Sequence, residues 1–201
     1  MRFKFVQFIA IRVCVVAAIA ACYGCGPNAK STVESMTVFG NETAKAKDSI
    51  DTAVRSLDTL VNSQPADLKN NFDAYSKSVS DLDDQSKVVK ANADKMRSNG
   101  DVFFKEWEGS NNVSPERRSQ LSGSYDRIKQ DMAGAKEAFI PFMASLRDIQ
   151  SYLGLDMSVK GVNSMAPLVA KAKDNSTQVK SQLDDVLVQL NSVRGMLSTA
   201  K

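Results

Sequence analysis

The stretch LKNNFDAYSKSVSDLDDQSKVVKANADKMRSNGDVFFKEW, residues 68–107, has an apolar side chain at every third or fourth position along almost its whole length. Only Ser86 and Gly100 interrupt the series. Its members are Leu68, Phe72, Tyr75, Val79, Leu82, Ser86, Val89, Ala93, Met96, Gly100, Phe103 and Trp107. This spacing places side chains on one face of an α-helix, and over about five heptads it is typical of helices that pack lengthwise on partners.

Two later stretches repeat the pattern. The first comprises Leu121, Tyr125, Ile128, Met132, Ala135, Phe139, Phe142, Leu146, Ile149 and Leu153. The second comprises Val162, Met165, Val169, Ala172, Ser176, Val179, Leu183, Val186, Leu190, Val193 and Leu197. Short connections between long helices force consecutive helices to lie antiparallel. We therefore predict an all-α fold, an elongated antiparallel bundle resembling a coiled coil, with three long helices and a weaker N-terminal one.

The first residues are typical of a bacterial secretory signal. Basic side chains precede the apolar run Val13–Ala21, and small residues follow before a cysteine. Arg12 shortens the run well below the roughly 20 residues of a membrane-spanning helix, so a permanent span is the weaker interpretation. The tetrapeptide Ile19-Ala20-Ala21-Cys22 is similar to the lipobox of bacterial lipoproteins, in which the cysteine is acylated and becomes the mature N-terminus. We therefore expect a signal peptide over 1–21 and lipidation of Cys22.

Cys25 is the alternative lipidation site, although the bulky Tyr23 precedes it where a small or β-branched residue is expected. Diacylation or triacylation of Cys22 would supply the two signals that stable membrane anchoring requires. Tyr23 also differs from the Asp that marks inner-membrane retention in many lipoproteins. We expect a chain anchored by its N-terminal lipid, in the outer membrane and facing the periplasm.

The remaining chain divides into a tether and one helical domain. We expect a tether over 22–31 and a bundle over 32–201, with helices at about 32–62, 66–108, 115–153 and 158–199. Breaks are predicted at Pro65, at the Gly109–Val113 turn and at Gly154–Ser158, because proline and glycine end helices. Ser114 and Pro115 should cap and begin the third helix. Pro141 lies inside it, and a kink is expected there.

The N-terminal helix has the poorest apolar pattern. Its clear positions are Ile50, Val54, Leu57 and Val61, whereas the preceding Gly40, Thr43 and Lys47 fit the same phase poorly.

Composition excludes several functional classes. The chain contains no histidine, which rules out Ser-His-Asp triads, Cys-His pairs and His-ligated metals. No cysteine cluster suits a metal, and no glycine-rich loop suits a nucleotide, so we predict no metal, no cofactor and no enzymatic activity. Removing residues 1–21 lowers Lys plus Arg from 26 to 23, against 23 Asp plus Glu, and this neutral balance does not fit a nucleic-acid binder.

Three side chains are possible partner contacts. Phe104 and Trp107 belong to the most aromatic stretch, residues 103–108, and aromatic residues often anchor interfaces, although packing in the core is the favoured interpretation. Arg147 is expected to pair with an acid on a neighbouring helix rather than to hold a ligand. The carboxylates of Asp81, Asp83 and Asp84 are expected to face water.

Several motifs resemble a known family. These are Phe103-Phe104-Lys105-Glu106-Trp107-Glu108, the Asn-rich turn, Arg117-Arg118-Ser119, Tyr125 and the segment Pro141–Asp148. Together they are similar to the bacterial DUF2959-type family, a domain of unknown function whose members often begin with a lipoprotein signal. The resemblance extends from about Lys45 to the C-terminus. It implies an elongated helical fold in the cell envelope, and it provides no catalytic residues. The chain departs from the family after Asp148, at residues 149–154.

These observations favour a non-enzymatic lipoprotein that acts as a helical spacer, scaffold or adaptor for envelope proteins, with self-association possible. The alternative is a binder of a hydrophobic ligand or client protein, through a bundle in which the poorly patterned N-terminal helix swings away.

Overall fold

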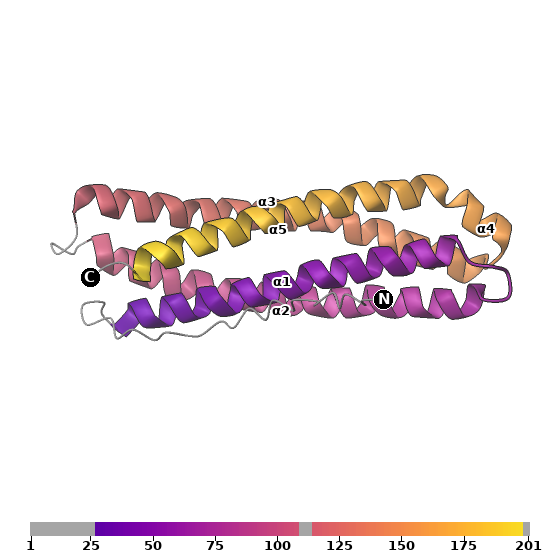
Figure 1. Cartoon of the computed structure of the whole chain (residues 1–201), viewed down its shortest axis with the longest axis horizontal. Helices are drawn as coiled ribbons and strands as arrows, with labels where there is room; N and C mark the ends of the chain where they lie inside the picture. The colour runs from indigo at the N-terminus through magenta and orange to yellow at the C-terminus, as the bar shows by residue number, and fades with distance from the viewer. Residues whose placement is uncertain (1–26, 109–113, 199–201) are drawn as a thin grey trace, which may run out of the picture.

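A computed structural model describes residues 27–108 and 114–198 of the chain. Helices occupy nearly all of these residues, and the described ranges contain no strand. The helices are α1 (Pro27–Val61), α2 (Leu68–Glu108), α3 (Pro115–Leu155), α4 (Val159–Ser164) and α5 (Ala166–Ser198). They form a single elongated bundle, which confirms the all-α prediction (Figure 1). None of these helices is long and apolar enough to cross a membrane.

The four long helices alternate in direction. α1 and α2 form one antiparallel hairpin, α3 and α5 form a second, and the hairpins meet where α1 packs on α5 and α2 packs on α3. α2 and α3 each contain 41 residues, so the bundle is about 60 Å long at 1.5 Å per residue. The start of α1 and the end of α5 lie at one end, which we call the terminal end. The α1–α2 connection and α4 lie at the opposite end, which we call the tip.

α1 begins at Pro27, five residues before the predicted start at about residue 32. Residues 27–31 are therefore helical, and Ala29 is buried. Pro27 suits the first helical position because its missing N–H would have no intrahelical partner there. The poorly patterned part of α1 is nevertheless well packed, since Met36, Phe39 and Thr43 are all buried. The Thr43 hydroxyl donates to the Phe39 carbonyl, so this buried polar group is satisfied within its own helix.

α3 begins as predicted. Ser114 is the N-cap, its hydroxyl accepts a hydrogen bond from the Arg117 N–H, and Pro115 follows at the first position. The helix continues through Pro141 without interruption. Residues 128, 135, 142 and 149 are all buried, so the heptad phase is the same on both sides of the proline. Pro141 lies on the exposed face. It has no N–H to donate to the backbone carbonyl of Glu137, and water can donate to that carbonyl instead.

The predicted helix over 158–199 is two helices. α4 ends at Ser164, Met165 follows as its C-cap, and α5 starts at Ala166. Pro167 explains the break, because it has no N–H to donate to the backbone carbonyl of Asn163. The Met165 carbonyl instead accepts from the N–H groups of Leu168 and Val169.

The apolar core consists of two clusters. The tip core includes Ile50, Leu57, Tyr75, Val79, Leu82, Phe142, Leu146, Ile149 and Val179. The terminal core includes Met36, Phe39, Met96, Phe103, Phe104, Tyr125, Ile128, Val186 and Leu190. On α1 and α2, a more polar waist separates them. There, the Gln85 amide donates to the backbone carbonyl and the carboxylate of Glu42, at 3.2 and 3.0 Å, and the Ser86 hydroxyl donates to the Asp83 carbonyl. The interruption of the apolar pattern at Ser86 thus falls where the two cores meet.

Candidate functional site

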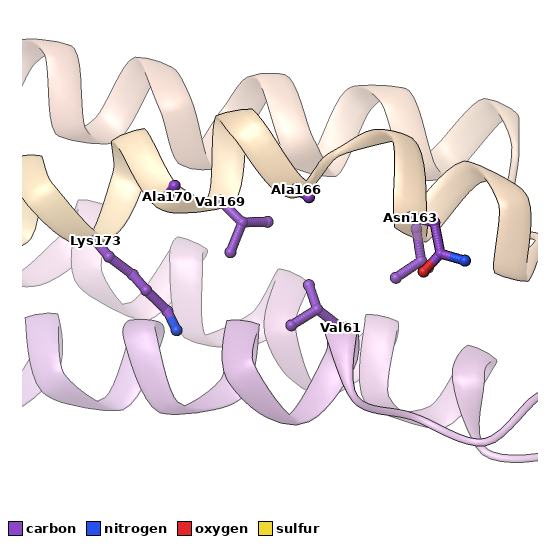
Figure 2. Close-up of a pocket in the computed structure, with 7 residues that line it drawn as sticks. Val61, Asn163, Ala166, Val169, Ala170 and Lys173 are labelled. Carbon is purple, nitrogen blue, oxygen red and sulfur yellow. The ribbon is translucent and has the colours of Figure 1, made fainter.

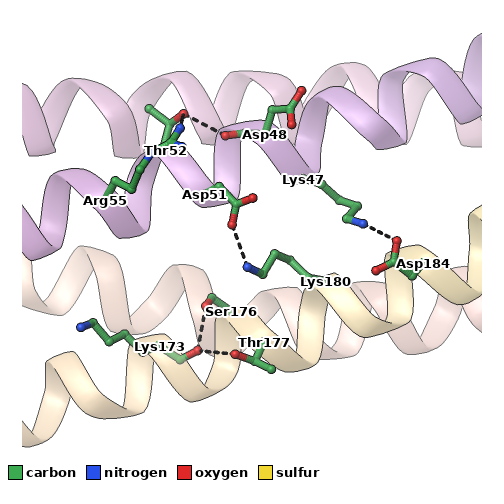
Figure 3. A network of polar contacts seen from close by, with 10 residues as sticks. All are labelled: Lys47, Asp48, Asp51, Thr52, Arg55, Lys173, Ser176, Thr177, Lys180 and Asp184. Atoms are coloured by element: carbon green, nitrogen blue, oxygen red, sulfur yellow. Dashed lines mark hydrogen bonds and ion pairs between the residues drawn. The ribbon is translucent and has the colours of Figure 1, made fainter. Parts of the chain in front are cut away.

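A ladder of ion pairs joins α1 to α5 (Figure 3). Lys47 pairs with Asp184, Asp51 pairs with Lys180 at 2.7 Å, and Asp58 pairs with Lys173. Steps of four and seven residues forward along α1 match steps of four and seven backward along α5. The ladder therefore follows one antiparallel register, in which each charge on α1 faces a charge of opposite sign on α5.

The ladder lies at the edge of the helix interface, with side chains 26 to 56% exposed. Ion pairs of this exposure contribute about 0–1 kcal/mol each, because water and salt screen them. Their main effect is then on alignment rather than on stability. Lys47, one of the positions that fit the apolar pattern poorly, is explained by this pairing.

An apolar groove of about 330 Å³ lies beyond the last ion pair, at the tip of the bundle (Figure 2). Continuing the ladder register by one turn brings Val61 opposite Ala170. The groove is lined by residues from the end of α1, from α4 and from the start of α5. They are Val61, Val162, Asn163, Ala166, Val169, Ala170 and Lys173. The small side chains of Ala166 and Ala170 leave a gap that a larger residue would fill. Lys173 lies at one end of the groove, where Asp58 already balances its charge.

A second set of charges joins α2 to α3. Arg147 on α3 pairs with Asp83 on α2, which confirms the prediction that it pairs with an acid on a neighbouring helix. Lys129 lies 3.9 Å from Asp101, and both pairs follow one antiparallel register. Lys87, one turn further along α2, donates to the Asp83 carboxylate. Lys87 and Arg147 together lower the pKa of Asp83, although partial burial of that carboxylate acts in the opposite direction. Asp83 is therefore an interhelical partner and not a freely solvated carboxylate.

Two buried tyrosines also bridge α2 and α3. One is on α2 and donates to α3, and the other is on α3 and donates to α2. The Tyr75 hydroxyl, in the tip core, donates to the Leu146 carbonyl at 2.7 Å. The Tyr125 hydroxyl, in the terminal core, lies 2.9 Å from the Arg97 carbonyl and 3.0 Å from Asp101. Burial raises the pKa of both phenols, and for Tyr125 the Asp101 carboxylate adds to the effect. Both phenols are therefore neutral donors at physiological pH.

The aromatic stretch at the end of α2 is packed into the terminal core. Phe104 is 6% exposed and stacks on Tyr125 with ring centroids 4.4 Å apart, while Phe103 contacts both Phe104 and Trp107. Phe104 thus has little surface for a partner, and Trp107 is partly buried against the same cluster. Gly100 accommodates the Tyr125 ring, since a Cβ atom there would lie 2.4 Å from the phenol oxygen.

An exposed apolar cluster surrounds the α3–α4 turn at the tip. It consists of Tyr152, Leu155, Met157 and Val159, of which Leu155 is 91% exposed. Sequence reasoning missed this surface, because Leu155, Met157 and Val159 lie just outside the heptad series. Apolar residues gathered in a predicted turn are the signal that could have identified it. We call these four residues the tip cluster.

Within residues 27–108 and 114–198, no group of three or more cysteine or acidic side chains is placed to hold a metal ion. The lipidation candidates Cys22 and Cys25, the predicted signal peptide and the predicted turn at 109–113 lie outside the described residues. The described arrangement can hold helices in register and present an apolar surface.

Comparison with known proteins identifies the family. The model of the DUF2959 family, described as proteins of unknown function, matches residues 31–193. The match begins earlier than the resemblance from about Lys45 suggested, and it includes nearly all of α1. No curated protein and no solved structure matches the chain.

Proposed function

Since the chain belongs to the DUF2959 family, whose description names no reaction or ligand, we propose a function from its architecture and its N-terminal sequence. The protein is a non-enzymatic lipoprotein, anchored through Cys22, or alternatively Cys25, in the outer membrane and facing the periplasm. It acts as a spacer, scaffold or adaptor for other envelope proteins.

The position of the tip cluster is the observation that supports this proposal most. α1 starts at the terminal end, close in sequence to Cys22, while the tip cluster lies about 60 Å away at the other end of the bundle. Clustered apolar side chains on a soluble surface often mark an interaction site. A lipid at one end and an apolar contact surface at the other would place a partner at a set distance from the membrane.

Metabolic labelling with a clickable palmitate analogue tests the anchor. The wild type should be labelled and should sediment with outer-membrane vesicles, and the Cys22→Ser variant should lose both properties. Equal labelling of Cys22→Ser and loss in Cys25→Ser would move the lipid to Cys25. Absence of label from the wild type would contradict the proposal.

Site-specific photo-crosslinking in cells tests the tip cluster. A photoreactive residue at position 155 should give a discrete adduct with an envelope protein. The matched control is position 188, because Val188 is 62% exposed but lies alone on α5. The adduct should weaken when Met157 and Val159 are both changed to Ser. Identical adducts from positions 155 and 188 would argue against a specific surface.

The groove supports a second candidate, binding of a hydrophobic ligand. Its volume of about 330 Å³ is at the small end of the range for ligand sites, and most of its lining is apolar. A fluorescent fatty-acyl probe should then bind the purified full chain, and Ala170→Leu, which fills the groove, should abolish binding. Binding unaffected by Ala170→Leu would place the probe elsewhere.

A further inference from the structure

The pattern of ion pairs and packing treats the bundle as two hairpins, α1–α2 and α3–α5. In the described residues, each ion pair between different helices joins the α1–α2 hairpin to the α3–α5 hairpin, and the five pairs lie on the α1–α5 and α2–α3 seams. Both tyrosine hydroxyls cross the same division. Packing follows it too, because α1 contacts α2, and α3 contacts α5, much more extensively than the hairpins contact each other.

The two ends of the bundle differ in how the hairpins are joined. The chain passes from one hairpin to the other between Glu108 and Pro115, at the terminal end. At the tip, the α1–α2 connection and the α4 segment each stay within one hairpin. The apolar groove also lies at the tip, on the α1–α5 seam, where its lining includes Val61 from α1 and the small Ala166 and Ala170 from α5 (Figure 2).

The division of the core allows the tip to move separately. The tip core and the terminal core are distinct clusters with the polar waist between them. Separation of the hairpins at the tip would break the Asp58–Lys173 pair, the Tyr75 hydrogen bond to Leu146 and the contacts of the tip core. The Phe104–Tyr125 stack in the terminal core would remain.

We infer that the bundle opens as two intact hairpins that part from the groove at the tip, while the terminal core stays closed. This differs from a movement of α1 alone, since α1 packs most extensively on α2 and the two would move together. The opening would present the apolar inner faces of both hairpins at the tip. The inference depends on the contacts between the helices and on neither proposed function.

Distance measurements on the full chain test this inference. Nitroxide labels on genetically encoded ketone residues leave the native cysteines unchanged. One pair, at the exposed positions 59 and 171, spans the hairpins at the tip, and a second pair, at 59 and 70, lies within one hairpin. Pulsed dipolar spectroscopy should detect a minor population with a longer 59–171 separation and a single 59–70 separation.

Matched tyrosine variants localise the movement. Tyr75→Phe removes the cross-hairpin hydrogen bond at the tip, and the open population should rise about fivefold, the ratio expected for loss of one such bond. Tyr125→Phe removes the equivalent bond in the terminal core and should leave the 59–171 distances unchanged. Ala170→Leu fills the groove and should reduce the open population.

Three outcomes of the distance measurements would overturn the inference. They are an equal response to Tyr75→Phe and Tyr125→Phe, a 59–70 distance that lengthens together with 59–171, and an Ala170→Leu variant that opens further. Circular dichroism of each variant separates opening from unfolding, because two intact hairpins keep the helical signal of the wild type. Loss of that signal in Tyr75→Phe would mean that the hairpins do not persist once apart, and this too would contradict the inference.

Discussion

Replacement of Gly100 by alanine tests the packing of the terminal core directly. In most helices this change is stabilising, because glycine costs about 1 kcal/mol relative to alanine in a helix interior. At this position the added Cβ would lie 2.4, 2.5 and 2.6 Å from three atoms of the Tyr125 phenol. Carbon atoms pack best at about 3.5–4.0 Å, so the ring would have to move by roughly 1 Å.

The Tyr125 ring has little freedom to make that movement. Phe104 stacks on its face, Lys129 lies 4.8 Å from its centroid on α3, and its hydroxyl is held at Arg97 and Asp101. Overpacking of a well-packed core costs about 1–3 kcal/mol, and loss of the hydroxyl hydrogen bond adds about 0.5–1.5 kcal/mol. After the helix-propensity gain, Gly100→Ala should destabilise the protein by about 1–3 kcal/mol.

Thermal unfolding followed by circular dichroism measures this effect. For a chain of this size, 1 kcal/mol corresponds to about 2–4 °C, so a loss of about 1–3 kcal/mol should lower the Tm by about 2–12 °C. Gly123→Ala is the matched control, since a Cβ at residue 123 meets no atom within 4 Å, and its Tm should rise slightly. In a Tyr125→Leu background the penalty of Gly100→Ala should largely disappear. If Gly100→Ala raised the Tm as much as Gly123→Ala does, the reasoning would be refuted.

Three further predictions concern charged and titratable groups. Asp51→Lys should lower stability by up to about 1 kcal/mol in denaturant titrations, the Asp51→Lys/Lys180→Asp pair should restore it, and 1 M salt should reduce the difference between them. Burial raises the pKa of Tyr75 above its ordinary value of 10. The stability that the neutral phenol contributes is therefore present below pH 10 and is lost as the pH rises above 10. Between pH 10 and pH 12, the free energy of unfolding should fall less in Tyr75→Phe than in the wild type. Burial and the Asp185 charge raise the pKa of Asp131, so its ionised form is unfavourable in the folded state, and Asp131→Asn should raise the Tm at pH 7 but not at pH 3, where the wild-type carboxyl is already protonated.

The apolar periodicity predicted most of the fold. The heptad positions of the three strong series are largely the buried positions of α2, α3 and α5, because lengthwise packing needs a continuous apolar face and little else. The pairing of Arg147 with an acid was also predictable. The break at Met165 was not recognised, although Pro167 was a visible signal for it. Thr43 appeared unsuited to a core, but its hydroxyl bonds within its own helix and so permits burial.

The candidate site was harder to predict, because it depends on how the helices align. Phe104 lies one position away from the apolar heptad series, where periodicity alone predicts an exposed side chain. In the structure it is buried and stacks on Tyr125. The ion-pair ladder joins charges that are far apart in sequence: Lys47 and Asp184 are 137 residues apart, Asp51 and Lys180 are 129 apart, and Asp58 and Lys173 are 115 apart. No local pattern brings such residues together. The groove likewise exists only where two alanines of one hairpin meet one valine of the other.

The ladder explains why one alignment of α1 and α5 is favoured over its neighbours. A slip of one heptad keeps apolar residues opposite apolar residues, so the core alone discriminates weakly against it. In one direction of slip, Asp51 would face Lys173, while Lys47 would face Thr177 and Asp58 would face Ala166. In the other direction, Asp58 would face Lys180, and Lys47 and Asp51 would face Asn191 and Leu187. Each slip retains one ion pair of three. Pairs that individually stabilise little can therefore specify the register collectively, and the same register brings Val61 opposite Ala170 and so creates the groove at the tip.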